Sequence, residues 1–331
     1  MLKVIVIAFI ILFFGCANDK KYQGPANRIV CLSSKQDMEY VKRAFDKVFS
    51  NIIYTPQPEN MYDIIYKDFL DFNDFRQSSN LIIASIFSFS DSTVDLYAKR
   101  LHNKMDSLHS IFIADDGFTD NQLLVCAFYD DTLSFINGIK DNDLWIRQNF
   151  NRQIKRNIIS SYKNKDQNDS LKNVIQNKFN LDLIVHHDYS ILDYGNDYIW
   201  IGRGSPYRWI IVQELDYKDT YDFIDIQNNL NSITKMDSMM VVNSIDGISD
   251  SVIKQTYTYK DEKIIDSIKA RFFRGLYQYY GTGGPFISYI FTKNNKNILV
   301  SSFVNNPGFD KLPMLIQQQA IIENIKILEK K

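Results

Sequence analysis

Cysteine and histidine are scarce in this chain of 331 residues. It holds three cysteines and four histidines, and they show neither CxxC nor HExxH spacing. Because protein metal sites draw their ligands from such clusters, the sequence predicts no metal site and no cofactor. The one adjacent histidine pair, His186-His187, ends a predicted strand, where neighbouring side chains face opposite sides of the sheet.

A catalytic motif is also lacking. The GxSxG word that places a nucleophilic serine on a sharp turn does not occur. Paired acids such as Asp130-Asp131 or Asp193 and Asp197 are the remaining route to acid–base chemistry, but carboxylates are common throughout the chain. No catalytic residue is therefore predicted, and the sequence favours a protein without enzymatic activity.

Neither charge sign dominates. The chain has 38 Lys and Arg against 39 Asp and Glu, for a net charge of −1. A nucleic-acid partner would require a basic excess, so none is expected.

Only the N-terminus carries a long apolar run. Val4–Phe14 is unbroken and follows Lys3. Its eleven residues fall short of the roughly 20 that a membrane-spanning helix needs, but they match the apolar core of a signal peptide. An ordinary signal peptide and a buried first strand are the alternatives.

Gly15-Cys16 directly follows this run and is itself followed by polar residues. A small residue before cysteine at this place resembles the lipobox of bacterial lipoproteins. The resemblance implies a signal peptide over 1–15, a lipid on Cys16 and a polar tether over 16–26. Two or more acyl chains would hold the globular part, 27–331, stably on a membrane. The predicted location is the cell envelope, facing the periplasm; the choice between inner and outer membrane stays open.

Composition and periodicity predict an α+β fold. Apolar residues make up 45% of the chain and aromatic residues 14%, which is enough for a large core. The first half alternates strands and helices, including one long helical stretch from Thr132 to about Ser160. The second half is richer in strands joined by tight loops and closes with a helix over 312–329, which predicts mainly antiparallel pairing. The globular part can divide into two halves, 27–162 and 168–331. Two similar α/β units are one possible form of these halves.

Cys31 and Cys126 remain once Cys16 is assigned to lipid. Both lie in apolar, strand-like runs where a buried thiol is common. An oxidising periplasm would allow them to pair. Two buried thiols are the favoured interpretation.

Three words near the C-terminus are the most distinctive. They are Arg271–Tyr277 (RFFRGLY), Gly283–Tyr289 (GGPFISY) and Phe303–Pro307 (FVNNP), with Arg156–Ile158 and Tyr198–Ile201 upstream. In this order they resemble an uncharacterised Bacteroidota lipoprotein family, the domain of unknown function 4837 (DUF4837). Tyr277, Thr282 and Asn305-Asn306 depart from the words typical of that family. The resemblance implies lipidation and an envelope location, and it implies no activity.

Four arginines are the candidate ligand-binding residues. Arg203 and Arg208 flank a loop between two strands, beside aromatic residues that suit a carboxylate, phosphate or sugar. Arg271 and Arg274 are added as candidates from the RFFRGLY word. The alternative is that these arginines are simply solvated. Gly281–Pro285 can be a phosphate cradle, but a strand follows it, so a hairpin turn with Pro285 at the strand's first residue is expected.

Asp-Ser or Asp-Thr followed by a mostly apolar residue recurs along the chain. This pattern resembles an O-glycosylation signal of periplasmic Bacteroidota proteins, and it is also a helix N-cap signature. The candidate acceptors are Ser92, Ser107, Thr132, Ser170, Ser238, Ser251 and Ser267.

The leading functional prediction is a membrane-anchored envelope lipoprotein that acts as a non-enzymatic binding or assembly module. Its expected partners are the membrane, through the lipid on Cys16, and an unidentified envelope protein or small ligand. The alternative is a periplasmic hydrolase acting on glycan or peptide.

Overall fold

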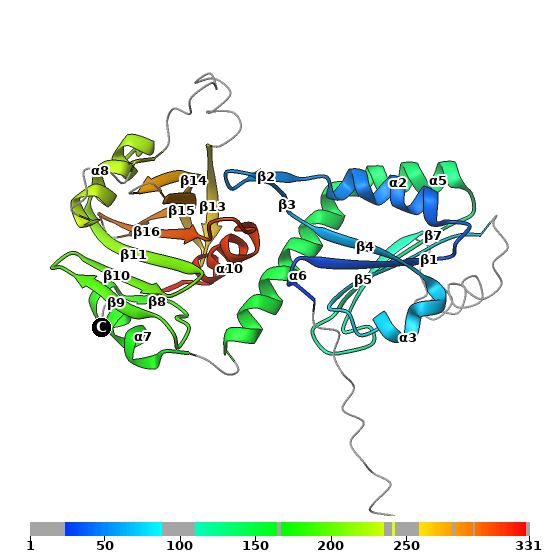
Figure 1. Ribbon diagram of the computed structural model, residues 1–331, viewed down its shortest axis with the longest axis horizontal. Helices are drawn as coiled ribbons and strands as arrows, with labels where there is room; N and C mark the ends of the chain where they lie inside the picture. The colour runs from blue at the N-terminus through cyan, green and yellow to red at the C-terminus, as the bar shows by residue number, and fades with distance from the viewer. Residues whose placement is uncertain are drawn as a thin grey trace, which may run out of the picture.

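A computed structural model describes residues 24–87, 110–163, 167–234, 240–241, 258–279, 282–293 and 295–328. The predicted signal peptide and Cys16 lie outside these residues. Within the described part, no helix combines the length and the apolar character needed to cross a membrane. The chain folds into two halves that lie side by side, each built around one main sheet (Figure 1).

The sheet of the N-terminal half has the strand order β4-β1-β5-β7-β6. Strands β4, β1, β5 and β7 pair in parallel, and β6 is antiparallel to β7. The inner parallel strands β1, β5 and β7 are buried on both faces, which explains why their sequences are almost continuously apolar. The edge strand β4 is half-buried and carries charged residues. The strands are β1 (Arg28–Ser33), β4 (Asp63–Asp68), β5 (Asn80–Ile86), β6 (Ile111–Asp115) and β7 (Leu123–Tyr129).

Helices α2 (Met38–Phe49), α5 (Thr132–Asp141) and α6 (Asp143–Lys163) cover one face of this sheet. In α2, Val41, Phe45 and Val48 recur at helical spacing and are buried. The opposite face packs on the short helices η1 (Phe69–Asp71) and α3 (Phe72–Phe75).

The two cysteines lie on opposite faces of the N-terminal sheet. Cys31 belongs to the core under α2 and α6, whereas Cys126 belongs to the core on the far face. Strand β5 also separates their strands. Both are free and fully buried, as the favoured interpretation expected, because a disulfide cannot pass through the sheet.

An antiparallel sheet forms the C-terminal half, with the order β12-β14-β15-β16-β11-β10-β9 and with β13 also paired to β14. The long central strands carry nearly all of the distinctive sequence words. The strands are β9 (Ser190–Tyr194), β10 (Tyr198–Arg203), β11 (Tyr207–Asp216), β12 (Met240–Val241), β13 (Tyr259–Ile265), β14 (Ile268–Tyr279), β15 (Thr282–Lys293) and β16 (Lys296–Asn305).

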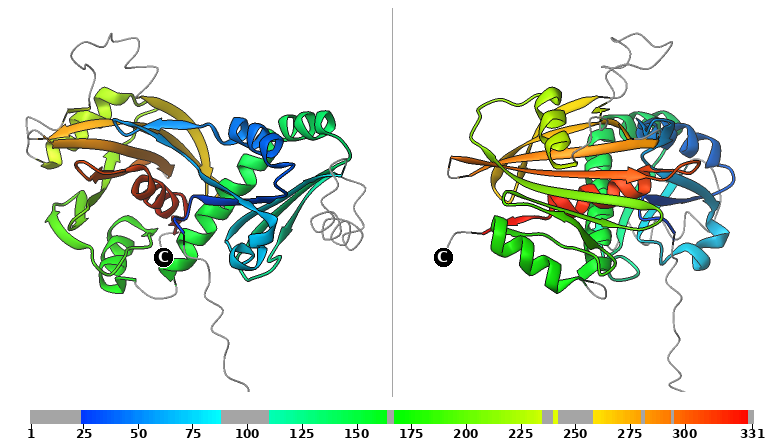
Figure 2. Two further views of the ribbon diagram at one scale, coloured as in Figure 1. Left: turned by 45° about the vertical axis from the view of Figure 1, so that its right-hand side comes forward. Right: turned by 60° about the vertical axis from the view of Figure 1, so that its left-hand side comes forward.

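Helix α10 (Leu312–Glu323) and helix α8 (Phe223–Thr234) lie on opposite faces of the C-terminal sheet (Figure 2). Alternation along each strand separates the two cores, so that Ile210 and Val212 face α10 while Ile211 faces the α8 side. Helix α7 (Asp169–Phe179) packs on the α10 side.

A single apolar core continues from the helices of the N-terminal half to the α10 face of the C-terminal sheet. Helix α6 runs along the junction beside α10 (Figure 1). The β2–β3 hairpin (Ile52–Tyr54 and Pro58–Asn60) reaches from the N-terminal half to the start of α10. There Glu59 accepts hydrogen bonds from the backbone N–H groups of Lys311 (2.9 and 3.0 Å) and Leu312 (2.8 Å). A carboxylate from one half therefore caps a helix of the other, where the helix dipole favours negative charge.

The α+β prediction is confirmed, and antiparallel pairing does dominate the C-terminal half. Three local expectations are wrong. The stretch 132–160 is two helices, α5 and α6, separated at Asn142. The strand expected over 181–186 is only β8 (Leu181–Asp182), and the last helix ends at Glu323 because Lys326–Ile327 forms β17 and pairs with β8.

Candidate functional site

A polar cleft of about 520 Å³ lies where the two halves meet. The N-terminal half contributes Ser78, Ser79 and Asn80 from the start of β5, and Asn157, Ser161 and Tyr162 from α6. The C-terminal half contributes His186 and Gln317. Residues 24–26, where the described chain begins, line the same cleft.

Helix α6 supplies its side of the cleft through helical spacing. Asn157 and Ser161 are four residues apart, as are Ile158 and Tyr162, so these two adjacent rows share one face of the helix. Ile158 and Tyr162 also belong to the core, which fixes the orientation of that face.

Three side chains of the cleft have a buried polar atom without a hydrogen-bond partner: Ser78 Oγ, Asn80 Oδ1 and Asn157 Nδ2. The other ends of the two amides are held. Asn80 Nδ2 donates to the carbonyls of Ala26 (3.1 Å) and Arg28 (2.8 Å), and Asn157 Oδ1 accepts from Gln153 (3.0 Å). Buried polar atoms are nearly always paired, so this group of free donors and acceptors indicates a place for a polar ligand or water.

Two arginines stand behind the C-terminal wall of the cleft. The β10–β11 hairpin places Arg203 opposite Arg208 in register. Arg208 is only 7% exposed, and its Nη1 donates to Gln317 Oε1 at 2.7 Å. Arg203 forms an ion pair with Asp188, and Asp188 also bonds His186 Nδ1 at 2.6 Å.

The charges of this cluster do not balance. Asp188 pairs with Arg203 and lies farther from Arg208, which has no ion-pair partner among the described residues. The Nε atoms of both arginines are buried and unpaired. Burial, together with the charge of Arg203, lowers the pKa of Arg208, and burial raises the pKa of the nearby Tyr162 phenol. The guanidinium nevertheless keeps its charge, and the buried cluster carries an excess of positive charge.

The other two candidate arginines lie elsewhere. Arg274 is on the α10 face of β14, where its guanidinium stacks on Tyr259 at 5.1 Å from the ring centroid. Arg271 is on the α8 face, where it donates to the carbonyl of Asp219 and lies 5.7 Å from the ring centroid of Tyr221. The structure therefore brings Arg203 and Arg208 together and leaves Arg271 and Arg274 outside the cleft.

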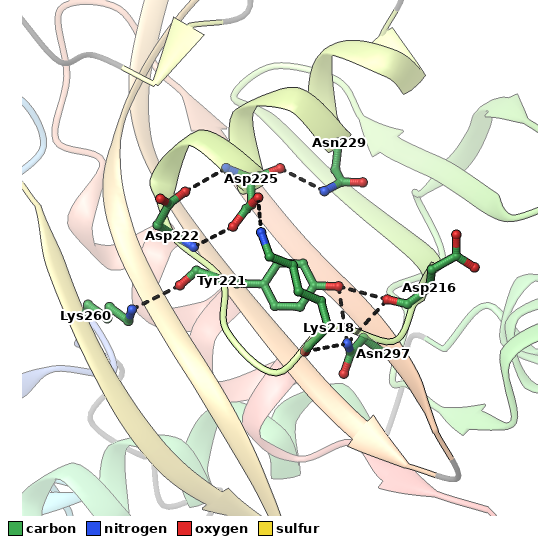
Figure 3. Close-up of polar contacts among 8 residues, drawn as sticks. All are labelled: Asp216, Lys218, Tyr221, Asp222, Asp225, Asn229, Lys260 and Asn297. Carbon is green, nitrogen blue, oxygen red and sulfur yellow. Dashed lines mark hydrogen bonds and ion pairs between the residues drawn. The ribbon is translucent and has the colours of Figure 1, made fainter.

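The loop that Arg271 contacts, between β11 and α8, is held by a network of polar contacts (Figure 3). Fully buried Asn297 donates to the carbonyl of Lys218 (3.1 Å) and to Tyr221 Oη (3.2 Å). Lys218 in turn pairs with Asp225 at 2.6 Å, at the start of α8. These contacts fix the connection between β11 and α8.

His186 and His187 do not gather further metal ligands. Their rings contact each other at 4.3 Å between centroids, and His186 also packs edge-on against Tyr162. In the described part of the chain, no group of three or more His, Cys, Asp or Glu residues has the spacing to hold a metal ion.

The prediction of a hairpin turn over Gly281–Pro285 is wrong for Gly283, Gly284 and Pro285, which lie inside a strand. Gly281 lies outside the described residues. Gly283 and Gly284 lie inside β15, and Pro285 is its fourth residue rather than its first. A Cβ on Gly284 would stand 2.1 Å from the carbonyl oxygen of Val304, and one on Gly283 would stand 2.5 Å from that of Tyr277. The glycines allow close approach of neighbouring strands, which leaves no cradle for a phosphate.

Three glycan candidates fall on described residues. Thr132 follows Asp131, which caps α5 by accepting from Ser134 N at 2.9 Å. Ser170 is exposed in the first turn of α7, and Ser267 is exposed in the β13–β14 turn at φ +64°. Ser92, Ser107, Ser238 and Ser251 lie outside the described residues, and glycosylation stays a prediction for all seven.

Sequence reasoning missed the residues that form the cleft itself. Ser78, Asn80, Asn157 and Gln317 come from three distant segments. Of these, only Asn157 belongs to a segment singled out in the sequence, Arg156–Ile158, and nothing there indicated a ligand site. Only the arginine pair left a signal, as two cations flanking a short loop between strands.

Comparison with known protein families identifies a domain in part of the chain and gives no activity. The family model described as a domain of unknown function (DUF4837) matches residues 167–324, which confirms the resemblance to this domain over this range. The Bacteroidota origin and the lipidation stay predictions. The range includes the three C-terminal words, whereas Arg156–Ile158 lies before it. No curated protein matches.

Two solved structures are similar to 45% of this chain. A crystal structure from Bacteroides thetaiotaomicron has 12% identity and a TM-score of 0.26, over 46% of its own chain. LpqN of Mycobacterium tuberculosis, described as involved in cell envelope biogenesis, has 14% identity and a TM-score of 0.27, over 83% of its chain. At these TM-scores the likeness transfers no function.

Proposed function

Residues 167–324 form a DUF4837 domain, and from this premise we propose that the chain is a lipid-anchored envelope protein that binds a small polar ligand in the cleft between its halves. The observation that carries the proposal is the group of unpaired polar atoms on Ser78, Asn80 and Asn157, together with the uncompensated charge of Arg208 behind them. Unpaired buried groups are costly, and natural proteins keep them chiefly where a ligand or water completes them.

If Cys16 carries a lipid, the cleft lies close to the membrane. Residues 24–26 line the cleft, and only residues 17–23 separate them from Cys16. An extended chain covers at most ~3.5 Å per residue, so the lipid would lie within roughly 28 Å of the cleft. Ligands released or carried at the membrane surface would therefore meet the site at high local concentration.

Binding is favoured over catalysis by the residues that line the cleft. Among the lining residues in the described part of the chain, none is a carboxylate, so the paired acids of a glycosidase are missing there. Asp131 caps α5, and Asp193 accepts from the phenol of Tyr198 at 2.8 Å. These acids serve local structure away from the cleft.

One observation keeps hydrolysis as the second candidate. His186 lines the cleft with Nδ1 held by Asp188 at 2.6 Å, an arrangement that orients a general base. Turnover of chromogenic ester, glycoside and peptide substrates by the purified protein, lost in His186→Asn, would favour the hydrolase over the binding module.

Substituting Cys16 by Ser is expected to release the protein from membranes, because the thioether lipid forms only on sulfur. After fractionation of cells, the wild type should pellet with membranes through a carbonate wash, and Cys16→Ser should appear in the soluble periplasmic fraction. Cys126→Ser, which alters a buried thiol, is the control and should pellet like the wild type. Membrane retention of Cys16→Ser would contradict the lipid anchor.

Filling the cleft with an indole is expected to abolish ligand binding. Ser79 lines the cleft and is exposed, so Ser79→Trp should fold and occupy the site. Saturation-transfer NMR on the soluble Cys16→Ser form would test a panel of monosaccharides, sugar acids, sugar phosphates, amino acids and dipeptides. At least one compound should bind the parent protein and not Ser79→Trp.

Ser232→Trp is the matched control, since Ser232 is exposed on α8 at the other face of the C-terminal sheet. It should bind like the parent. Binding that survives Ser79→Trp, or a panel without any binder, would count against a ligand site in the cleft.

A further inference from the structure

We infer that the ligand of the cleft is a hydroxyl-rich organic anion, a sugar acid or sugar phosphate, whose carboxylate or phosphate is bound by Arg208 and Tyr162. This inference rests on the proposed function and adds the chemical class of the ligand. It follows from three features of the site: a buried cation without a counter-charge, a neutral oxygen at a place that suits an anionic one, and three unpaired polar atoms on residues that line the cleft.

The first feature is the missing counter-charge of Arg208. A guanidinium stays charged in proteins, and a buried charge is costly unless an opposite charge compensates it. Asp188 already serves Arg203 and His186. Arg208 is left with two neutral groups, the amide of Gln317 and the phenol of Tyr162, and with a free Nε. One oxyanion would balance the cluster.

The second feature is the position of Gln317 Oε1. This atom accepts from Arg208 Nη1 at 2.7 Å and lies 3.5 Å from Tyr162 Oη. Gln317 is partly exposed and lines the cleft, so its side chain can swing aside without disturbing α10. A carboxylate or phosphate oxygen at the same place would accept from both donors. It would also add the attraction of opposite charges and allow a bidentate pair with the guanidinium, which the neutral amide oxygen does not provide.

The third feature selects hydroxyl groups for the rest of the ligand. Asn80 Oδ1 is a free acceptor, Asn157 Nδ2 is a free donor, and Ser78 Oγ is both. A hydroxyl group donates and accepts at once, so it satisfies either kind of atom. About 520 Å³ falls within the usual range for small-ligand sites and has room for one or two sugar rings.

Such an anion has two sources near a membrane: a free sugar acid or sugar phosphate, or the phosphoglycerol headgroup of a lipid. Both share hydroxyl groups beside an oxyanion. Arg208 is 7% exposed and lies behind Gln317, so a small free molecule can reach it more easily than a headgroup held in a bilayer; binding to vesicles distinguishes the two.

Isothermal titration calorimetry on the Cys16→Ser form would measure binding of glucuronate, glucose 6-phosphate, glucose and inorganic phosphate. One of the two sugar anions is expected to bind at least about tenfold more tightly than glucose and than inorganic phosphate, since a charge-assisted hydrogen bond contributes this much. Co-sedimentation with vesicles of phosphatidylglycerol, compared with vesicles of phosphatidylcholine, tests the lipid headgroup as the source of the anion. Binding to phosphatidylglycerol that is lost in the Arg208 variant would identify the ligand as a headgroup with the same chemistry.

Arg208→Gln is expected to weaken binding of the sugar anion by roughly tenfold to a hundredfold. Arg274→Gln is the matched control, because Arg274 lies on the same face of the sheet but outside the cleft, and it should leave the affinity within about twofold. Should Arg208→Gln fail to fold, Arg208→Lys keeps the charge and removes the forked donors, and a loss of at least about fivefold is expected.

Three results would overturn the inference while leaving the cleft a ligand site. The first is that glucose binds as tightly as the sugar anions. The second is that the Arg208 and Arg274 variants bind the sugar anion with equal affinity. The third is that all compounds whose binding is lost in Ser79→Trp are neutral or cationic. If no compound binds the parent protein and fails to bind Ser79→Trp, both the inference and the proposed function are wrong.

Discussion

Replacing Glu323 by Gln is expected to lower the free energy of unfolding by about 3 kcal/mol at pH 7. Glu323 ends α10 at the junction of the halves, and its side chain is 10% exposed. It pairs with Lys155 of α6 and with Lys263 of β13 (2.6 Å), and accepts from Tyr289 Oη at 2.7 Å. One carboxylate thus joins the N-terminal half to two strands of the C-terminal sheet.

The size of the effect follows from the pKa of this carboxyl. Burial alone would raise the pKa, but the ammonium groups of Lys155 and Lys263 and a hydrogen bond from Gln319 outweigh it and lower the pKa from 4.5 to about 2. Such a shift corresponds to about 3 kcal/mol of preference for the folded state in the ionised form. Glutamine is close in shape to the protonated acid, so Glu323→Gln removes this contribution.

The pH dependence has a definite sign. Because the folded-state pKa is depressed, the stabilisation is fully present above about pH 4.5 and is lost as the pH falls toward 2. Urea unfolding of the Cys16→Ser form and of its Glu323→Gln variant should differ most at pH 7 and converge below pH 4.5.

Glu262→Gln provides the control for Glu323→Gln. Its ion pair with Lys269 (2.7 Å) is on the surface, with the carboxylate side chain 59% exposed, so the change should stay within about 0.5 kcal/mol. A difference between the parent and Glu323→Gln that does not vary from pH 7 to pH 3 would mean that packing, and not the ionised carboxylate, holds the junction.

The junction also shows why sequence patterns located the core elements but not the site. Apolar runs such as Leu123–Tyr129 and the periodic residues of α2 and α7 predict their own structure, because burial of one element imposes a local period. Glu59, Glu323 and Asn157 carry no such period. Each is an ordinary polar residue until a segment from the other half is packed against it.

Short or polar strands and helix breaks were not predicted from the sequence for a related reason. Strand β3 (Pro58–Asn60) has no apolar alternation, and it exists because it pairs with β2 and presents Glu59 to α10. The break between α5 and α6 is made by Asn142, whose side chain donates to the carbonyl of Gly138 at 2.8 Å. An asparagine after a helical glycine is a weak local signal inside a long periodic stretch.

The arginine pair is the part of the site that the sequence did reveal. A short connection between two strands predicts a hairpin, and a hairpin sets its two ends opposite each other. Arg203 and Arg208 are therefore neighbours by local geometry alone. Their burial, and the role of Gln317 in front of them, depend on α10 covering this face of the sheet and were not available from local pattern.

Replacing Gly284 by Ala is expected to destabilise the fold by about 4 kcal/mol, which is at the upper end for single substitutions. The new Cβ would stand 2.1 Å from the carbonyl oxygen of Val304 in β16, a backbone atom of a strand that is buried from Asn297 onward. Relief requires β15 and β16 to move apart next to the first pair of their ladder, Phe286 and Phe303. This movement strains the ladder hydrogen bonds there and disturbs the cores that pack on both faces of the sheet. Thermal and urea unfolding of the Cys16→Ser form with and without the substitution would measure the loss.

Gly204→Ala is the matched control, because a Cβ there meets no atom within 4 Å. Its expected effect is close to zero, or a slight gain from the smaller entropy of the unfolded chain. A large loss for Gly284→Ala and none for Gly204→Ala would show that the glycines of the Gly-Gly-Pro motif are needed for strand packing in β15. This agrees with the short distances from a Cβ at Gly283 or Gly284 to the backbone of neighbouring strands. If Gly284→Ala were as stable as Gly204→Ala, the strands would have room for a methyl group, and the motif would need an explanation from binding rather than from packing.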